Sequence, residues 1–142
     1  DRDIAKVLGV SQATVTRMRN KFVKDRLIQQ FTIIPDLAKI GFEILAVTSF
    51  RSRVKPEFRE RAIKWTMSRP NIIFAARAQG MGKNGVIISI HRNYTEYSNF
   101  LSDLMSEGGE DVQDYDSLLV SLRAFIAKQF SLKYLAELFE MA

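Results

Sequence analysis

Apolar side chains recur at helical spacing in two short stretches near the start of the chain. The two stripes consist of Ile4, Val7 and Leu8, and of Val15, Met18 and Phe22. Gly9 stands between them, and glycine is the usual residue at the left-handed C-terminal cap of a helix. Ser11 follows in an N-cap position, where its hydroxyl can accept a hydrogen bond from a first-turn amide. The pattern predicts a tight helix–turn–helix with Gly9 at the corner.

Two helices that meet at such a turn are expected to bury apolar side chains against each other. That set consists of Ile4, Ala5, Leu8, Val10, Val15 and Met18. The other side of the second helix then faces outward, and from Gln12 to Lys24 it carries amide, hydroxyl and cationic groups without a carboxylate. A solvated helix face is the alternative that the pattern alone leaves open.

Beyond Gln29 the pattern alternates between short apolar strands and amphipathic helices. A β-rich segment at 30–36 ends at Pro35 and Asp36, which stop a strand. Further strands are expected at 42–51, 72–79, 85–92 and 114–126, and helices at 56–70, at 95–109 and from Ser131 to Phe139. Thr95 is expected to cap the middle helix, and Gly80, Gly82 and Gly85 to form a loop. The order β-α-β-β-α-β is typical of a ferredoxin-like unit.

The sequence therefore predicts an α+β protein in three parts. Residues 1–30 form an incomplete, winged-helix-like helix–turn–helix, and residues 31–41 form a linker strand or hinge. Residues 42–142 form a βαββαβ domain with a C-terminal helix. The continuous apolar character of 42–51 indicates burial on both faces or a sheet that packs on a partner.

The net charge of +5 is concentrated at the start of the chain. Residues 1–28 hold seven basic and three acidic side chains, whereas the remainder holds fourteen and thirteen. Such an asymmetry favours a local surface for a polyanion. The chain of 142 residues has no cysteine, one histidine and no apolar run long enough to cross a bilayer. We expect a cytoplasmic protein without a cofactor, metal site or membrane partner.

The outward face of the second helix carries side chains that can contact a DNA duplex. The candidate DNA-binding residues are Ser11, Gln12, Thr14, Thr16, Arg17, Arg19, Asn20, Lys21 and Lys24. Arginine can pair with guanine, and glutamine or asparagine with adenine, at base edges in the major groove. Lysines along the helix contact phosphates, which position the protein without specifying sequence. The pattern predicts a recognition helix in the major groove.

At these residues the chain resembles the Lrp/AsnC family, the feast/famine transcription regulators of bacteria and archaea. The small residue, the turn glycine and the apolar positions of the family motif match Ala5, Gly9, Ile4, Leu8, Val10, Val15 and Met18. The family has a further helix before this pair, so the resemblance implies that the first helix of the DNA-binding domain is missing here. It also implies a βαββαβ module that forms homodimers, tetramers or octamers and senses effectors.

The glycine loop after the second strand of the βαββαβ unit is a candidate effector site. The resemblance implies that an amino acid or other small molecule binds at this hairpin, through Gly80, Gly82 and Asn84. The loop lacks the acidic residue of the family motif, which would balance an α-amino group. An ordinary hairpin turn explains the same glycines.

Other polar residues carry weaker signals. His91 is expected to be a surface or edge residue at a strand end rather than a catalytic base, and Asp114 and Asp116 are expected to be solvated. Arg51 and Arg53 flank a strand end and face either a phosphate or a subunit.

We therefore expect a sequence-specific DNA-binding transcription regulator, not an enzyme, with double-stranded DNA and a second copy of the chain as partners. The alternative is a ferredoxin-like sensor or regulatory module whose basic head binds protein. An acylphosphatase-like enzyme is a weaker third hypothesis, because no glycine accompanies Arg51, Arg53 and Lys55.

Overall fold

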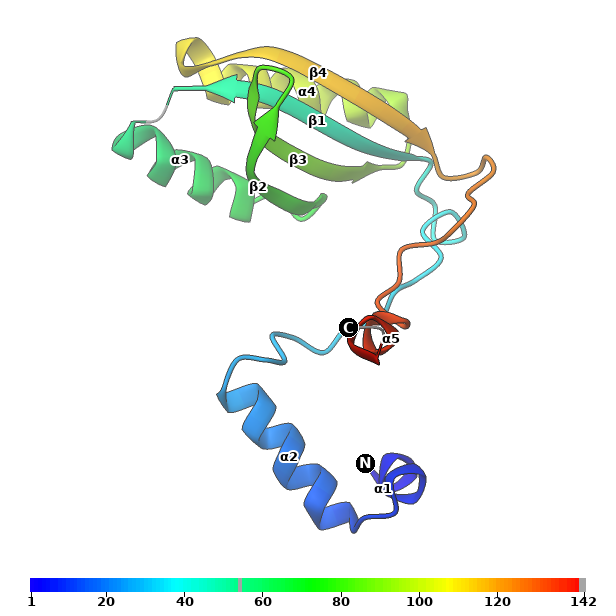
Figure 1. The fold of residues 1–142 in the computed structure, drawn as a ribbon. Coiled ribbons are helices and arrows are strands. Elements are labelled where there is room, and N and C mark those ends of the chain that lie inside the picture. The colour runs from blue at the N-terminus through cyan, green and yellow to red at the C-terminus, as the bar shows by residue number, and fades with distance from the viewer. Residues whose placement is uncertain (54, 141–142) are drawn as a thin grey trace. The chain divides into compact units, whose positions relative to one another are not determined.

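The computed structural model describes residues 1–53 and 55–140, with the Glu140 side chain left out. The chain divides into two compact units, Asp1–Ile34 and Pro35–Ala142, which are described separately below. Figure 1 shows the elements of both units. Among the described residues, no helix is both long enough and apolar enough to span a bilayer.

The first unit is a helix–turn–helix, as the apolar spacing predicted. Helix α1 (Arg2–Leu8) ends at Gly9, which adopts a left-handed conformation with φ 66° and donates its amide to Ala5 and Lys6 carbonyls. Helix α2 (Gln12–Lys24) begins at Ser11, whose Oγ accepts from the Thr14 amide at 3.1 Å. Both predicted caps are confirmed, and together they fix the turn between the helices.

The apolar side chains of this unit are much less buried than the pattern predicted. Ala5 and Val15 are each only 6% exposed, so the helices touch at this point. The expected burial of the other members is wrong, since Ile4, Leu8, Val10 and Met18 are 51%, 59%, 41% and 45% exposed. Two short helices meet along a single line, and a third element is needed to enclose a whole stripe.

The segment after α2 does not form the predicted strand. Residues 29–36 belong to no ladder within the described chain, and residues 37–41 form a turn. Asp36 organises this turn, because its Oδ1 accepts from the Lys39 amide at 3.1 Å and its carbonyl from the Ile40 amide at 3.3 Å. A β-rich sequence becomes a strand only where a partner strand satisfies its backbone groups, and this segment has none in the described residues.

The second unit is an antiparallel sheet with helices on one face. Its elements are β1 (Ile44–Ser52), α3 (Pro56–Met67), β2 (Ile72–Gly80), β3 (Lys83–His91), α4 (Tyr94–Gly108), the short helix η1 (Gly109–Asp111), β4 (Val112–Ser121) and α5 (Leu135–Glu140). The strand order is β2-β3-β1-β4 (Figure 1). This arrangement confirms the predicted ferredoxin-like βαββαβ unit.

Several boundaries in this unit differ from the prediction. The strand expected at 114–126 runs instead from Val112 to Ser121, and α3 ends at Met67 rather than at residue 70. Asn93, not Thr95, caps α4, because the Asn93 Oδ1 accepts from the Glu96 amide at 2.9 Å. Gly85 lies in β3 rather than in the loop, opposite Phe50. A Cβ added to Gly85 would lie 2.3 Å from the Phe50 ring, so the absence of a side chain here leaves room for that ring.

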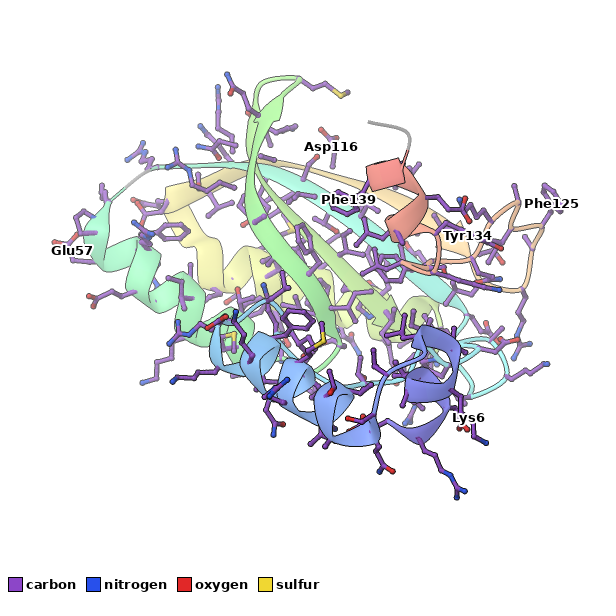
Figure 2. All side chains as sticks on the ribbon, turned by 60° about the horizontal axis from the view of Figure 1, so that its bottom comes forward. Lys6, Glu57, Asp116, Phe125, Tyr134 and Phe139 are labelled. Atoms are coloured by element: carbon purple, nitrogen blue, oxygen red, sulfur yellow. The ribbon has the colours of Figure 1, made fainter. Side chains whose placement is uncertain are left out.

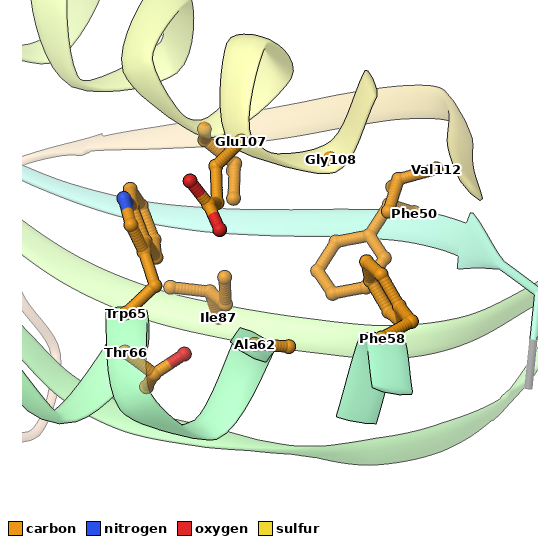
Figure 3. A pocket seen from close by; sticks show the side chains of 10 residues that line it. Phe50, Phe58, Ala62, Trp65, Thr66, Ile87, Glu107, Gly108 and Val112 are labelled. Atoms are coloured by element: carbon orange, nitrogen blue, oxygen red, sulfur yellow. The ribbon is translucent and has the colours of Figure 1, made fainter. Parts of the chain in front are cut away.

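The core lies between the sheet and helices α3 and α4. Ile87, Phe100 and Leu104 form its buried centre, with Trp65 and Phe50 packed against it. A small apolar hollow remains between the two helices and the sheet, and Figure 3 shows the Phe50, Phe58 and Ile87 side chains that line it. Core side chains on β1 and β3 alternate with residues that point to the opposite face.

That opposite face, called the open sheet face below, is apolar and carries no helix of the βαββαβ core. It consists of Leu45, Val47, Phe74, Val86, Ile88, Ile90, Leu118 and Val120, which the strand registers place on one side. Phe74, Leu118 and Val120 are 54%, 68% and 37% exposed. The sequence expectation that β1 is apolar on both sides therefore agrees with a sheet that has two apolar faces.

The segment after β4 carries several large exposed side chains. Phe125, Tyr134 and Phe139, which Figure 2 labels, are 92%, 48% and 77% exposed. The predicted C-terminal helix forms, but it begins at Leu135 rather than at Ser131. Ser131 instead accepts the Lys133 amide in a short turn.

Candidate nucleic-acid interface and effector hairpin

One side of α2 is an exposed, carboxylate-free surface. Arg17, Asn20, Lys21 and Lys24 are exposed there, and Gln12 is exposed in the first turn of the helix. Their spacing of three or four residues from Arg17 to Lys24 places them on adjacent turns of the helix. In the part of the chain that the structure describes, neither Arg17 nor the two lysines form an ion pair. The cationic groups of this surface are therefore available to an anionic partner.

Two other predicted DNA contacts point to α1 instead. The Asp1 Oδ2 accepts from the Thr16 Oγ1 at 2.7 Å and from the Arg19 Nη2 at 2.8 Å. The Asp1 side chain is 14% exposed, and its carbonyl accepts the Ala5 amide at the start of α1. Asp1 thus ties the first turn of α1 to the middle of α2. Thr16 and Arg19 hold the two helices together in this structure.

Ser11 and Thr14 form the start of α2. The two hydroxyl oxygens lie 2.9 Å apart, in addition to the capping bond from the Thr14 amide. Because this cap uses the acceptor capacity of Ser11, its first role is to fix where the helix begins. The nine predicted residues therefore separate into an outward group of five, a capping pair and a pair that is bound to Asp1. Sequence spacing did not reveal Asp1, since it lies fifteen residues before Thr16.

The predicted effector loop is a two-residue hairpin. Met81 and Gly82 have φ angles of 52° and 72°, and Gly80 pairs with Lys83 across the turn. Positive φ at both central residues defines the type I′ turn that suits the twist of two antiparallel strands. Gly82 has a conformational reason to be glycine as a central residue of this turn, and Gly80 has one because its own φ is 144°. Met81 is 98% exposed at the tip.

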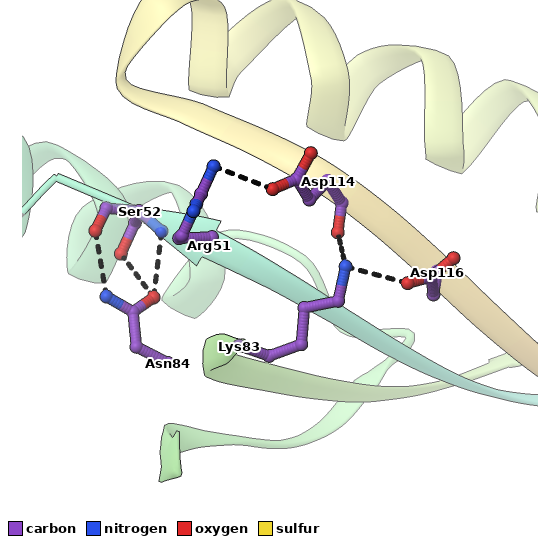
Figure 4. A network of polar contacts seen from close by, with 6 residues as sticks. All are labelled: Arg51, Ser52, Lys83, Asn84, Asp114 and Asp116. Carbon is purple, nitrogen blue, oxygen red and sulfur yellow. Dashed lines mark hydrogen bonds and ion pairs between the residues drawn. The ribbon is translucent and has the colours of Figure 1, made fainter. Parts of the chain in front are cut away.

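Asn84, the third predicted effector residue, is bound to the end of β1. Its Oδ1 accepts from the Ser52 amide at 2.8 Å and from the Ser52 hydroxyl at 3.2 Å, and its Nδ2 donates to the Ser52 carbonyl at 2.8 Å (Figure 4). The side chain continues the β1–β3 ladder by one step. Its carbonyl oxygen has both acceptor sites filled, so an effector can use Asn84 only by displacing Ser52 or through the remaining N–H.

The carboxylates Asp114 and Asp116 are exposed, as expected, and they also form ion pairs next to this hairpin. Asp114 lies 2.9 Å from Arg51, and Asp116 lies 2.7 Å from the Lys83 Nζ, which also donates to the Asp114 carbonyl (Figure 4). Asp114 has φ 56° at an irregularity in the β1–β4 ladder between Ser49 and Arg51. The bulge is the tertiary feature that brings these charges together.

The expectation that His91 is at the surface is wrong. It is 1% exposed, its Nε2 lies 2.8 Å from the Ser89 Oγ, and its ring centroid lies 5.0 Å from that of Phe100. Burial lowers the pKa of His91 below 6.5, and the nearby Glu96 opposes this shift. The period of two along β3 places His91 on the same face as Ile87, a signal that was present in the sequence.

Solved structures share this fold over almost the whole chain. An AsnC family transcriptional regulator from Agrobacterium tumefaciens aligns with 93% of this chain and 85% of its own, with a TM-score of 0.73 and 18% identity. A transcriptional regulator from Neisseria meningitidis in complex with L-Met aligns with 92% and 84%, with a TM-score of 0.72 and 16% identity.

E. coli AsnC aligns with 90% of this chain and 83% of its own, with a TM-score of 0.69 and 17% identity. The chain therefore has the fold of the AsnC/Lrp regulators, as the helix–turn–helix residues and the βαββαβ order predicted. No protein-family model matches the chain, and no curated protein matches its sequence at significance.

Proposed function

We propose that this chain is a sequence-specific, DNA-binding transcription regulator of the Lrp/AsnC type and has no enzymatic activity. The observation that carries the proposal is the surface of α2, where three unpaired cationic side chains and two amides are exposed without a carboxylate. Duplex DNA attracts such a surface through its phosphates and offers distinct acceptors at its base edges. The shared fold supports the same conclusion.

The geometry refines the proposed contacts. Arg17, Asn20 and Gln12 lie on the outward side and are the proposed base-reading residues, whereas Lys21 and Lys24 contact phosphates. Thr16 and Arg19 act through Asp1 by holding α2 against α1. Ser11 and Thr14 set the first turn, where exposed backbone amides can meet a phosphate.

We further propose that the working form is a homodimer formed through the open sheet face. An apolar surface of this kind on a soluble protein marks an interaction site. A two-fold axis through the face would place Val47, Ile88 and Leu118 of one copy against the same residues of the other. Two α2 helices related by that axis would read a palindromic site with half-sites about one helical turn apart.

A small molecule is the proposed modulator of this regulator. One solved structure with the fold contains L-Met, and another, a feast or famine regulatory protein from M. tuberculosis, is complexed with L-methionine. In this chain the proposed contact is the hairpin backbone at Gly80 and Gly82, since Asn84 is bound to Ser52.

Selection of bound sequences from a random duplex pool tests the proposal. We expect a palindromic consensus, because a symmetric dimer reads both half-sites alike. Titrations of that consensus should show log affinity falling linearly with log salt. Failure to enrich any sequence, together with no salt-dependent binding to random duplex, would reject DNA binding and favour a sensor whose basic head binds protein.

A further inference from the structure

A groove of about 490 Å³ lies between α3 and the β2–β3–β1 part of the sheet. It lies next to the small hollow of Figure 3 and shares with it the Phe50, Phe58 and Ala62 side chains. Its volume falls within the range of small-molecule sites in proteins. None of its lining residues belongs to the α2 surface or to the hairpin turn at Met81 and Gly82.

The floor and the rim of this groove differ in chemistry. Apolar side chains from α3 and the sheet form the floor, among them Phe50, Phe58, Ala62, Ala75 and Ile87. Four cationic side chains, Arg53, Lys55, Arg59 and Arg77, also line the groove, and no carboxylate among the described residues joins them. The other polar residues of the lining are Ser52, Thr66 and Asn84. Arg59 comes from α3 and Arg77 from β2, so positive charge stands on both walls.

Neighbouring acids neutralise only part of this charge. Lys55 lies 3.4 Å from Asp111, and the same carboxylate group lies 3.8 Å from Arg61, which does not line the groove. Within residues 1–53 and 55–139, Arg53, Arg59 and Arg77 form no ion pair. The three guanidinium groups have no partner there, although each can bind a carboxylate through two parallel hydrogen bonds.

We propose that this groove binds an amphipathic organic carboxylate, with the anionic group at the arginines and the apolar body on the floor. The charge selects an anion, and the apolar floor selects against a free phosphate or a duplex, because neither has a surface that gains from leaving water. The site is independent of the proposed DNA contacts, and its occupancy can be measured without DNA.

The experiment is isothermal titration of the full chain with 4-phenylbutyrate, 4-phenylbutyramide and inorganic phosphate. We expect saturable binding of the carboxylate with a Kd on the order of 1 mM. The amide has the same apolar phenylalkyl group but no charge, and it should bind at least about tenfold more weakly. Phosphate has the charge but no apolar group, and it should also bind at least about tenfold more weakly. If the protein bound the amide or phosphate as tightly as the carboxylate, the proposal would be overturned.

Variants locate the site. Arg59→Gln and Arg77→Gln should each weaken 4-phenylbutyrate about fivefold or more, whereas Arg92→Gln, at an exposed arginine outside the groove, should leave it unchanged. Ala75→Leu, which fills the floor, should weaken binding while the arginines stay intact. Circular dichroism confirms that each variant is folded. No saturable binding, or equal loss in Arg92→Gln, would reject the groove as a carboxylate site.

A DNA titration distinguishes a carboxylate site from a nucleic-acid surface at the groove arginines. If Arg59→Gln and Arg77→Gln lower affinity for duplex DNA while no carboxylate binds, the groove arginines belong to a nucleic-acid surface and the proposal is wrong. If the carboxylate binds but duplex affinity stays at the parent value, the ligand site stands whether or not α2 reads DNA.

Discussion

Asp1 binds some of the polar side chains of α2 and leaves others facing outward. It holds Thr16 and Arg19 toward α1 and leaves Arg17 and Asn20, which neighbour them in sequence, on the outward side. A helix turns by 100° per residue, so adjacent residues point in different directions: Thr16 and Arg19 join the helices, and Arg17 and Asn20 face outward. This division yields different expectations for variants at neighbouring positions.

Arg17→Ala should weaken binding to the selected duplex by about 1–3 kcal/mol and relax preference at one base pair. The reason is the loss of a bidentate contact to a base edge, which carries sequence information. Fluorescence anisotropy with the consensus and with single-base variants of it measures both effects. Equal affinity of the variant and the parent for the consensus would remove Arg17 from the interface.

Lys24→Ala should weaken all duplexes alike and reduce the slope of log affinity against log salt by about 1, since one phosphate contact is lost. Lys6→Ala is the matched control, because Lys6 is an exposed lysine on α1 rather than on the proposed surface. A variant that changes preference between sequences would contradict the assignment of Lys24 to phosphates.

The free energy of unfolding should fall as the pH is lowered through 6.5. Burial keeps the folded-state pKa of His91 below that value, so the unfolded chain takes up the proton first. The stability contributed by neutral His91 is therefore complete above pH 6.5 and is lost below it. Urea unfolding at pH 7.5 and pH 5.5 measures the difference, and His91→Gln should make it smaller. An unchanged difference in that variant would assign the pH dependence to other groups.

At the scale of elements, short connections decide how α1 and α2 meet. Gly9 and Ser11 end one helix and begin the next within three residues, so the angle between the helices depends on very few dihedrals. The buried contact they create is small, being centred on Ala5 and Val15. Loss of the cap geometry should therefore affect this unit more than it would affect a helix pair with a large core.

Gly9→Ala should lower the free energy of unfolding of the first unit by about 1–2 kcal/mol, the cost of a left-handed conformation for an L-residue. The space around Gly9 is open within 4 Å, so the cost comes from the backbone and not from a clash. Gly9→Asn should cost less, because asparagine tolerates this conformation. Helical circular dichroism during urea unfolding reports the change. Equal losses in both variants would point to a different cause.

At the scale of the whole molecule, the sheet separates two apolar surfaces. One is closed by α3 and α4 over Phe100 and Leu104, and the other is the open sheet face. Burying one such face within the chain and leaving the other exposed is unfavourable for an isolated soluble protein. A second copy would remove the exposed surface from water without any change of fold.

Leu118→Glu should convert the proposed dimer to a monomer, because it places a charge within the proposed apolar interface. Met67→Glu is the matched control: Met67 is 82% exposed on α3, away from the open sheet face. Sedimentation equilibrium measures the mass of each variant. A parent chain that is monomeric at all accessible concentrations, or a Leu118→Glu variant that remains dimeric, would reject the open sheet face as the interface.

The sequence by itself determined the elements and most of their order. Helical spacing located α1 and α2, a glycine and a serine located their caps, and period-two alternation located the strands of the βαββαβ unit. These features depend on local backbone preference and on which side of an element is apolar, and both can be derived from neighbouring residues. The carboxylate-free surface of α2 was predictable for the same reason.

Only the tertiary structure decided which side chains form hydrogen bonds or ion pairs with distant residues. The pairing of Asp1 with Thr16 and Arg19, of Asn84 with Ser52 and of Asp116 with Lys83 joins residues that are far apart in sequence. It also decided that residues 29–36 find no strand partner among the described residues and that cations from α3 and β2 share a groove. Such contacts follow from how elements are placed in space, which no local pattern contains.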